Sequence, residues 1–221
     1  MILGISASGR RNRIVEQTVK AILDQTGMEY ELISLAGKTI NGCTGCLGCA
    51  DTNICVLKDD WAEIADKMKK ADAIVFGAPK YFGSINARGH ACLERTFSFR
   101  HKCVFPLKGK PAISVSTSSI WAQHRLPLTS EDPVKNFIQA LLKENGMDIV
   151  GHVIADGYGP CFTCGYGHNC NAGGAITKKS QRIGGFEKED YPLDFPDQKE
   201  TMQQVREVAG LLVDRLNVKS S

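Results

Sequence analysis

Short apolar stretches alternate with amphipathic ones along this chain. Five of the apolar stretches have the composition of buried strands, at residues 2–6, 30–35, 73–77, 111–116 and 149–155. Between and after them, apolar residues recur at three- and four-residue intervals, which predicts helices at 14–25, 61–70, 85–97, 132–145 and 198–216. Strands that alternate with helices predict an α/β fold with a parallel sheet, because each crossover lays a helix against one face of the sheet.

Local signals support two of the helix starts. Asp59 and Asp60 precede the helix at 61–70 and offer side-chain acceptors for its first N–H groups. Pro133 stands in the first turn of the helix at 132–145, where its missing N–H is tolerated. In a parallel sheet of this kind, ligands bind beyond the carboxyl ends of the strands. The loops that follow the strands are therefore where binding residues are expected.

Composition and charge narrow the class of protein. With 221 residues, 43% hydrophobic and 23% charged, the chain fits one soluble globular domain over residues 1–221. The formal charge of +3 is small and evenly spread, which gives no reason to expect nucleic-acid binding. No stretch approaches the roughly 20 apolar residues of a membrane span, and no export signal is recognised. The odd number of nine cysteines predicts thiols kept for metals in a reducing cytoplasm, in an anaerobic or low-oxygen host.

Four of the cysteines fall in one glycine-containing loop, residues 41–56. Cys43, Cys46, Cys49 and Cys55 follow a C-x2-C-x2-C-x5-C spacing. Three thiolates at such short intervals match loops that hold cubane iron–sulfur clusters, whereas structural zinc usually takes two ligand pairs separated by a longer finger. The spacing predicts a redox-active iron–sulfur site, with a structural zinc knuckle or uncoordinated thiols as the alternatives.

The loop after the first strand is polar and basic. It contains Ser6, Ser8, Arg10, Arg11 and Asn12 and runs directly into a helix. Free N–H groups at a helix start, together with hydroxyl and guanidinium groups, form a seat for an anion such as a phosphate. The loop matches neither the GxGxxG fingerprint nor a P-loop, so neither a Rossmann site nor an NTPase is predicted. A solvated basic turn is the alternative.

The loop after the third strand combines a stiff entry, a tight bend and two aromatic rings. Pro79 restricts the entry and Gly83 permits the bend, while Tyr81 and Phe82 stand where a flat ring could rest. From the residues alone, the two aromatic side chains are equally consistent with packing in the core.

Together these loops resemble those of a known family. Residues 2–10 are similar to the opening of the NADPH-dependent FMN reductase superfamily, and residues 77–84 (Gly-Ala-Pro-Lys-Tyr-Phe-Gly-Ser) resemble its second flavin loop. With the four-cysteine loop between them, residues 1–155 and the final helix resemble the iron–sulfur flavoproteins of methanogens and other anaerobes. The resemblance implies noncovalently bound FMN and a flavodoxin-like three-layer fold, with five parallel strands in the order 2-1-3-4-5.

The resemblance also implies a role for each loop. The FMN phosphate would be held by the first loop: Ser8, Arg10 and Asn12, with Ser6 and Arg11 beside them. The isoalloxazine would be lined by Pro79, Lys80, Tyr81, Phe82, Gly83 and Ser84, and a third flavin loop would comprise Ser116, Thr117, Ser118 and Ser119. A [4Fe-4S] cluster would be bound by Cys43, Cys46, Cys49 and Cys55. A homodimer or homotetramer with the flavin near a subunit boundary is implied as well.

The chain departs from the family pattern within the flavin loops. Ile14 and Val15 replace a polar pair that contacts phosphate in the family, and Arg11 and Arg13 are expected to offset that loss. Lys80 replaces a small apolar residue, and its charge would stabilise an anionic reduced flavin. The third loop is rich in serine instead of glycine.

A cysteine-rich insertion, residues 156–196, separates the fifth strand from the last helix and is longer than an ordinary connection. It contains Cys161, Cys164 and Cys170, and residues 161–166 resemble a rubredoxin-type knuckle. A second metal site, iron–sulfur or zinc, is therefore predicted, with free thiols in a lid over the flavin as the alternative. The candidates for its fourth ligand are Cys92, Cys103 and His168.

The predicted function follows from combining two redox centres. A flavin exchanges electrons in pairs or singly, whereas a cubane cluster carries one, so a protein with both connects the two kinds of chemistry. We predict an FMN- and iron–sulfur-dependent oxidoreductase that passes electrons from a ferredoxin-like donor or NAD(P)H to a small-molecule acceptor, and no general acid or nucleophile stands out. The alternatives are an NAD(P)H-dependent FMN or quinone reductase with structural zinc, and a non-catalytic redox sensor that binds a partner through the insertion.

Overall fold

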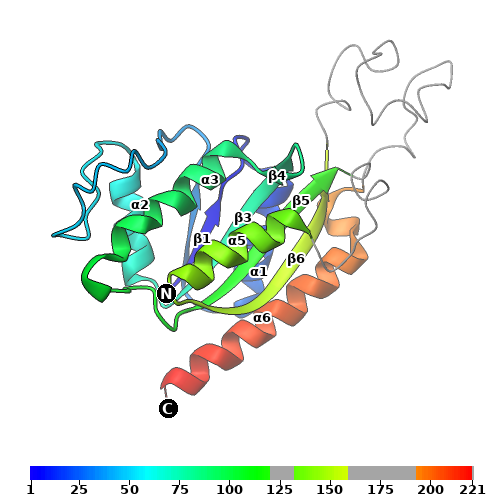
Figure 1. The fold of residues 1–221 in the computed structure, drawn as a ribbon. Helices are drawn as coiled ribbons and strands as arrows, with labels where there is room; N and C mark the ends of the chain where they lie inside the picture. Colours follow the sequence, from blue (N-terminus) through cyan, green and yellow to red (C-terminus); the bar gives the residue numbers. More distant parts are fainter. Residues whose placement is uncertain (120–131, 159–192, 221) are drawn as a thin grey trace, which may run out of the picture.

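Five parallel strands form the middle layer of the protein (Figure 1). The computed structural model describes residues 1–119, 132–158 and 193–220. The strands are β1 (Ile2–Ser6), β2 (Tyr30–Ser34), β3 (Ala73–Tyr81), β5 (Pro111–Ser119) and β6 (Asp148–Gly157). Their order across the sheet is β2-β1-β3-β5-β6. This is the flavodoxin-like order that the family resemblance implied. Each of the five predicted apolar stretches is a strand of the sheet.

The prediction was wrong about one helix start, where the structure has a sixth strand. The short β4 (Ser84–Ile85) pairs antiparallel with the end of β3. The helix expected over 85–97 is instead α3 (Ala87–Glu94), followed by the 3₁₀ turns η1 (Arg95–Phe99) and η2 (His101–Cys103). Helical spacing of side chains does not reveal that the backbone of Ile85 is already paired with Lys80. β3 likewise runs past Gly77, because its backbone pairs with β5 as far as Pro79.

Helices cover both faces of the sheet (Figure 1). α1 (Ile14–Thr26) and α6 (Lys199–Ser220) pack on one face, and α2 (Trp61–Lys70), α3 and α5 (Pro133–Glu144) pack on the other. Val75 and Phe76 are neighbours in β3 but belong to different apolar clusters, because successive side chains of a strand point to opposite faces. Because the strands are parallel, the residues after β1, β2 and β3 lie at the same end of the sheet as the carboxyl end of β5. Within the described ranges, no helix is both long enough and apolar enough to cross a membrane.

Gln198 joins the two chain segments that flank residues 159–192. It follows the short 3₁₀ turn η6 (Phe195–Asp197) and is almost fully buried. Its side-chain oxygen accepts the N–H of Asp156 at 2.9 Å, and its amide nitrogen donates to the carbonyl oxygens of Asp156 at 2.8 Å and Leu193 at 3.0 Å. One side chain therefore holds the end of β6 against the start of the final helical segment.

Candidate functional site

The loop after β1 leaves a helix start open to an anion. Residues 9–13 are exposed, and Arg13 at the N-cap of α1 contributes no side-chain bond to the first N–H groups of this helix within the described structure. Ser8 accepts the N–H of Arg10 at 3.0 Å, which turns the chain toward α1. The buried hydroxyl of Ser6 has no hydrogen-bond partner among the described residues. Uncapped N–H groups beside exposed cations are the chemistry that a phosphate requires.

The arginines of this loop differ in what they contact. Arg11 donates to the carbonyl oxygen of Ala36 at 3.2 Å, so it ties the loop to the residues after β2. Arg10 donates to the carbonyl oxygen of Tyr158 at 3.4 Å, beyond the end of β6. Asn12 adopts a positive φ of 53°. Of the predicted phosphate residues, Ser6 and Ser8 are buried and Arg10, Arg11 and Asn12 are exposed, and the two arginines connect this loop to the residues after β2 and after β6.

The predicted second flavin loop is a β-hairpin. Its turn consists of Phe82 and Gly83, with φ values of 49° and 79°, as expected for the type I′ turn that joins two antiparallel strands. Phe82 is fully exposed and Tyr81 is 44% exposed, which excludes the alternative that they pack in the core. A bulky side chain at positive φ is unfavourable, so the hairpin holds Phe82 at its tip at a cost in stability.

Lys80 and the start of the third flavin loop are engaged inside the protein. The ammonium of Lys80 lies 3.6 Å from Asp132 Oδ1, just before α5. Ser116 and Thr117 are buried, and the hydroxyl of Ser116 donates to Asp132 Oδ2 at 2.6 Å. The backbone of residues 118 and 119 continues β5 opposite residues 156 and 157 of β6. The charge of Lys80 is therefore paired, which the sequence did not indicate.

The four loop cysteines face one small cavity. Cys43, Cys46, Cys49 and Cys55 all line it, and the rest of its wall includes the apolar side chains Leu47, Val56, Leu57 and Phe97. The thiol of Cys46 is exposed, that of Cys49 is buried, and the other two are half-buried. No group of three or more histidine, cysteine or carboxylate side chains in the described ranges is arranged to hold a single metal ion. The structure nevertheless places the four predicted ligands around one cavity.

The surroundings of the thiols differ in charge and hydrogen bonding. The N–H of Gly48, followed by the hydroxyl of Thr44, lowers the pKa of Cys46 below its ordinary value. Burial raises the pKa of Cys49, and the neighbouring thiols add to this effect. Nε2 of His101 lies 3.1 Å from the sulfur of Cys49. No local pattern predicted that contact, because His101 lies in η2, far from Cys49 along the chain.

A buried ion pair fixes the start of the cysteine loop. Arg95 contacts Asp59 at 2.7 Å, with both side chains almost fully buried, and also donates to the carbonyl oxygen of Asn41 at 2.8 Å. Burial by itself would raise the pKa of Asp59, but hydrogen bonds from Arg95 and from the N–H groups of Asn41 and Trp61 together hold it below its ordinary value. The N-cap of α2 is Asp60, whose side chain makes no capping bond, and Asp59 one residue earlier accepts the N–H of Trp61 at 3.1 Å instead.

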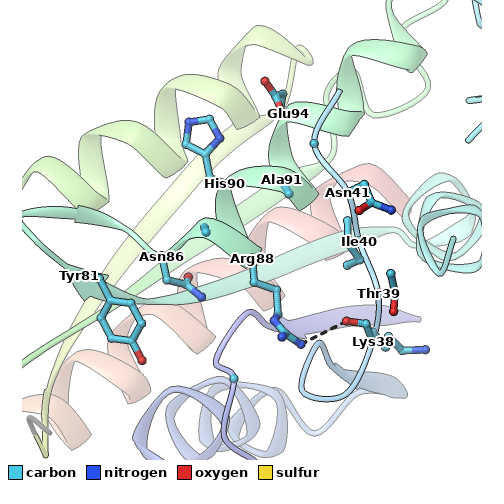
Figure 2. Close-up of a pocket in the computed structure, with 13 residues that line it drawn as sticks. Lys38, Thr39, Ile40, Asn41, Tyr81, Asn86, Arg88, His90, Ala91 and Glu94 are labelled. Atoms are coloured by element: carbon cyan, nitrogen blue, oxygen red, sulfur yellow. Dashed lines mark hydrogen bonds between the residues drawn. The ribbon is translucent and has the colours of Figure 1, made fainter. Parts of the chain in front are cut away.

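A hollow of about 830 Å³ connects the flavin hairpin with the cysteine loop (Figure 2). Tyr81 lies at one end, and Asn41 and Glu94 lie at the other. Arg88 reaches from α3 to the carbonyl oxygen of Lys38 at 3.2 Å and thereby holds the loop after β2 against α3. Glu94 accepts the N–H of Cys43 at 2.9 Å, so the wall of the hollow is bonded directly to the first cysteine.

The donor sets fit the groups that the resemblance implies. The open start of α1, with the unpartnered hydroxyl of Ser6 nearby, suits the phosphate of FMN. Four thiols around one cavity, with the charge of Arg95 behind them, suit an anionic iron–sulfur cluster. Cys161, Cys164 and Cys170 lie outside the described residues, so the second metal site stays a prediction.

Known proteins show the same combination of features. A model of the family described as NADPH-dependent FMN reductase matches residues 1–128, which include the three predicted flavin loops and the cysteine loop. The chain belongs to this family. An iron–sulfur flavoprotein of Methanocaldococcus jannaschii is 33% identical over 166 residues, which cover 72% of this chain and 82% of that protein. The chain therefore groups with the iron–sulfur flavoproteins within the NADPH-dependent FMN reductase family.

Two further comparisons agree with this family. An iron–sulfur flavoprotein of Methanosarcina thermophila is 34% identical over 118 residues, which cover 52% of this chain and 61% of that protein. The solved structure of a flavone reductase superposes with a TM-score of 0.61 at 18% identity, covering 99% of this chain and 64% of that chain, which shows the fold alone. Membership in the NADPH-dependent FMN reductase family makes this chain a flavin-dependent oxidoreductase and supports FMN as its flavin.

Proposed function

We propose that this flavoprotein binds FMN and a [4Fe-4S] cluster and transfers electrons from a ferredoxin-like donor or NAD(P)H to a small-molecule acceptor. One observation carries the proposal. Tyr81 of the flavin hairpin and Asn41 and Gly42, directly before Cys43, line the same hollow. A flavin and a cluster held by these two loops would face a common space, as electron transfer between them requires.

Each loop has a defined task in this proposal. The flavin supplies two-electron chemistry when bound, and the cluster supplies one-electron chemistry. The first loop binds the phosphate through Ser8, Arg10 and the N–H groups of α1, while Tyr81 and Phe82 present rings for stacking. Cys46, whose pKa is lowered, is the loop cysteine best prepared to act as a thiolate ligand.

The hollow itself suits a small reactant with polar groups. Asn86 is buried at its wall, and its Oδ1 lacks a hydrogen-bond partner among the described residues, while its Nδ2 donates to the carbonyl oxygen of Ala7 at 2.8 Å. The amide of Asn86 thus adds a polar group to the wall of the hollow. The position next to Tyr81 would place such a reactant beside the flavin hairpin.

Exposed apolar side chains around the thiols support a homo-oligomer. Leu47, Ile54, Val56 and Phe97 are exposed at or beside the cysteine cavity. Apolar side chains gathered around one site usually mark an interface. We propose that a second copy of the chain covers them. Light scattering should show that the wild-type protein is a dimer or tetramer. The Leu47→Ser variant should be a smaller species, because the substitution weakens the proposed interface.

The proposal is tested by purifying the protein without oxygen and measuring its FMN, iron, acid-labile sulfide and zinc. We expect the protein to contain FMN. We also expect it to contain iron and acid-labile sulfide in amounts equal to each other. Cys46→Ser should lose iron and sulfide but retain FMN. Cys92→Ala is the matched control, because Cys92 is fully buried in the apolar core away from the cavity and burial raises its pKa to about 12, which argues against the predicted role of Cys92 as a metal ligand.

Other outcomes identify the alternatives. Zinc without sulfide would replace the cluster by a structural metal and leave a plain FMN or quinone reductase. Iron or zinc in excess of the cluster, lost in Cys161→Ser, would support the second metal site. Visible spectra recorded while NADPH or reduced ferredoxin is added separately would identify the donor. Protein that contains neither FMN nor sulfide would refute the proposal.

A further inference from the structure

A connected set of polar side chains lies on the face of the sheet that α5 covers. Lys80 comes from β3, Ser114 and Ser116 from β5, and His152 from β6, while Asp132 stands at the N-cap of α5. The side chains of Lys80 and Asp132 are 13% exposed and that of His152 is 9% exposed. The set lies beside the apolar cluster that includes Phe76, Ala112 and Ile138 on this face.

The set is continuous from His152 to Lys80. His152 Nδ1 lies 2.7 Å from Ser114 Oγ, and its Nε2 lies 3.1 Å from Ser116 Oγ. Ser116 in turn contacts Asp132 Oδ2 at 2.6 Å, and Asp132 Oδ1 lies 3.6 Å from the ammonium of Lys80. Strand register explains the first contacts, because Ser114 and His152 are directly opposite each other in β5 and β6.

The positions of the hydrogens follow from the carboxylate. Asp132 only accepts, so Ser116 donates to it and must itself accept from Nε2–H of His152. His152 Nδ1 is then an acceptor for the hydroxyl of Ser114, whose oxygen accepts from the amide of Gln139 at 3.0 Å. Burial lowers the pKa of His152 to about 4, so the neutral ring that this arrangement requires is the form present at neutral pH.

A buried polar set of this kind has a cost that apolar packing avoids. Replacing buried polar or ionic networks by well-packed apolar residues is often neutral or stabilising, so stability alone gives little reason for one. What such a network does provide is a fixed geometry, when all its members are satisfied. Its end here is Lys80, two residues before Phe82 at the tip of the flavin hairpin.

We propose that Asp132, held in place by Ser116 and His152, is a positioning residue that fixes the Lys80 ammonium and offsets its charge in the flavin hairpin. This inference rests on the proposed binding of FMN. A free ammonium beside the flavin would favour the more negative, reduced form, and a carboxylate at 3.6 Å opposes that effect. The pair thus sets how strongly the protein prefers reduced over oxidised FMN.

The test compares the binding of oxidised and reduced FMN among charge variants. Asp132→Asn keeps a good N-cap for α5, whose Val134 N–H bonds to Asp132 at 3.1 Å, but removes the negative charge. We expect it to increase the preference for reduced FMN about tenfold, which is about 30 mV for a two-electron couple. Lys80→Met should change the preference in the opposite direction, and the double variant should return close to the wild type.

Two variants separate positioning from general damage. His152→Ala should shift the preference in the same direction as Asp132→Asn, whereas His152→Gln retains a donor for Ser116 and should remain near the wild type. Lys67→Met is the matched control, because Lys67 also forms ion pairs, with Glu31 and Glu63, but on α2. The preference of Lys67→Met for reduced over oxidised FMN should equal that of the wild type.

The outcomes are distinguishable. If the wild type binds FMN but Asp132→Asn and Lys80→Met shift its preference no more than Lys67→Met does, the inference is wrong and the proposed function stands. If Asp132→Asn does not fold, Lys80→Met against Lys67→Met decides in the same way. A wild-type protein that binds no FMN overturns both.

Discussion

Lowering the pH should destabilise this protein through His152. The ring is buried and neutral, with a pKa of about 4, whereas an unfolded histidine has a pKa near 6.5. Because the unfolded chain binds the proton first, the stability that His152 contributes is complete above about pH 6.5 and is lost as the pH falls toward 4. The two values correspond to about 3 kcal/mol of unfolding free energy.

The groups that face His152 work in both directions. Burial dominates, the Asp132 carboxylate at 3.9 Å raises the pKa, and Lys135 on α5 lowers it further. Lys80 faces the same carboxylate from β3 and is neutralised by it. The net effect is a ring that resists protonation.

Urea unfolding at pH values between 7.5 and 4.5 measures this effect. His152→Gln cannot titrate, so between pH 7.5 and 4.5 the wild type should lose about 2–3 kcal/mol of unfolding free energy relative to the variant. Carboxylates whose pKa is lowered, such as Asp59, are common to both proteins and cancel in the difference. Parallel pH profiles for the two proteins would refute the reasoning.

Three further substitutions test the loops. Phe82→Gly should stabilise the fold by about 1 kcal/mol, because it relieves a positive φ, yet weaken FMN binding, as unfolding and fluorescence titrations would show together. Arg95→Met leaves Asp59 buried without its partner and should cost about 3–5 kcal/mol in urea unfolding, with a loss of bound iron. Glu94→Ala should reduce iron loading, because the N–H of Cys43 loses its acceptor, whereas Glu94→Gln should retain it; equal loading in both would contradict this role.

The strands of the sheet were predictable because each one has a local sequence pattern. Each strand is a short apolar stretch followed by a helical one, and the structure confirms all five. The strand order came from the resemblance to a family, since residues 2–6 carry no local signal for a neighbour 70 positions away. The start of α3 was predicted wrongly, because the hairpin that pairs Ile85 with Lys80 has the same apolar spacing as a helix.

The candidate site was predictable where its residues are close in sequence. Cys43 to Cys55 and the hairpin around Phe82 are local motifs, and the structure brings each together. The contact of His101 with Cys49 and the pairing of Asp132 with Lys80 each join residues about 50 positions apart. Such residues meet only in the folded protein, so no local pattern predicts these contacts. Ser114 and Ser116 in β5 and His152 in β6 are polar residues within the apolar stretches that predicted these strands, and this was a signal for the polar set.

The bonds of Gln198 hold the chain before and after residues 159–192 at one place. The flanks of this segment, Asp156 and Leu193, are fastened to one buried amide, so the chain returns close to where it left the sheet. Closing such a gap with a short glycine–serine bridge carries a small entropic cost. A different insertion could therefore replace residues 159–192 without a change to the sheet and its helices.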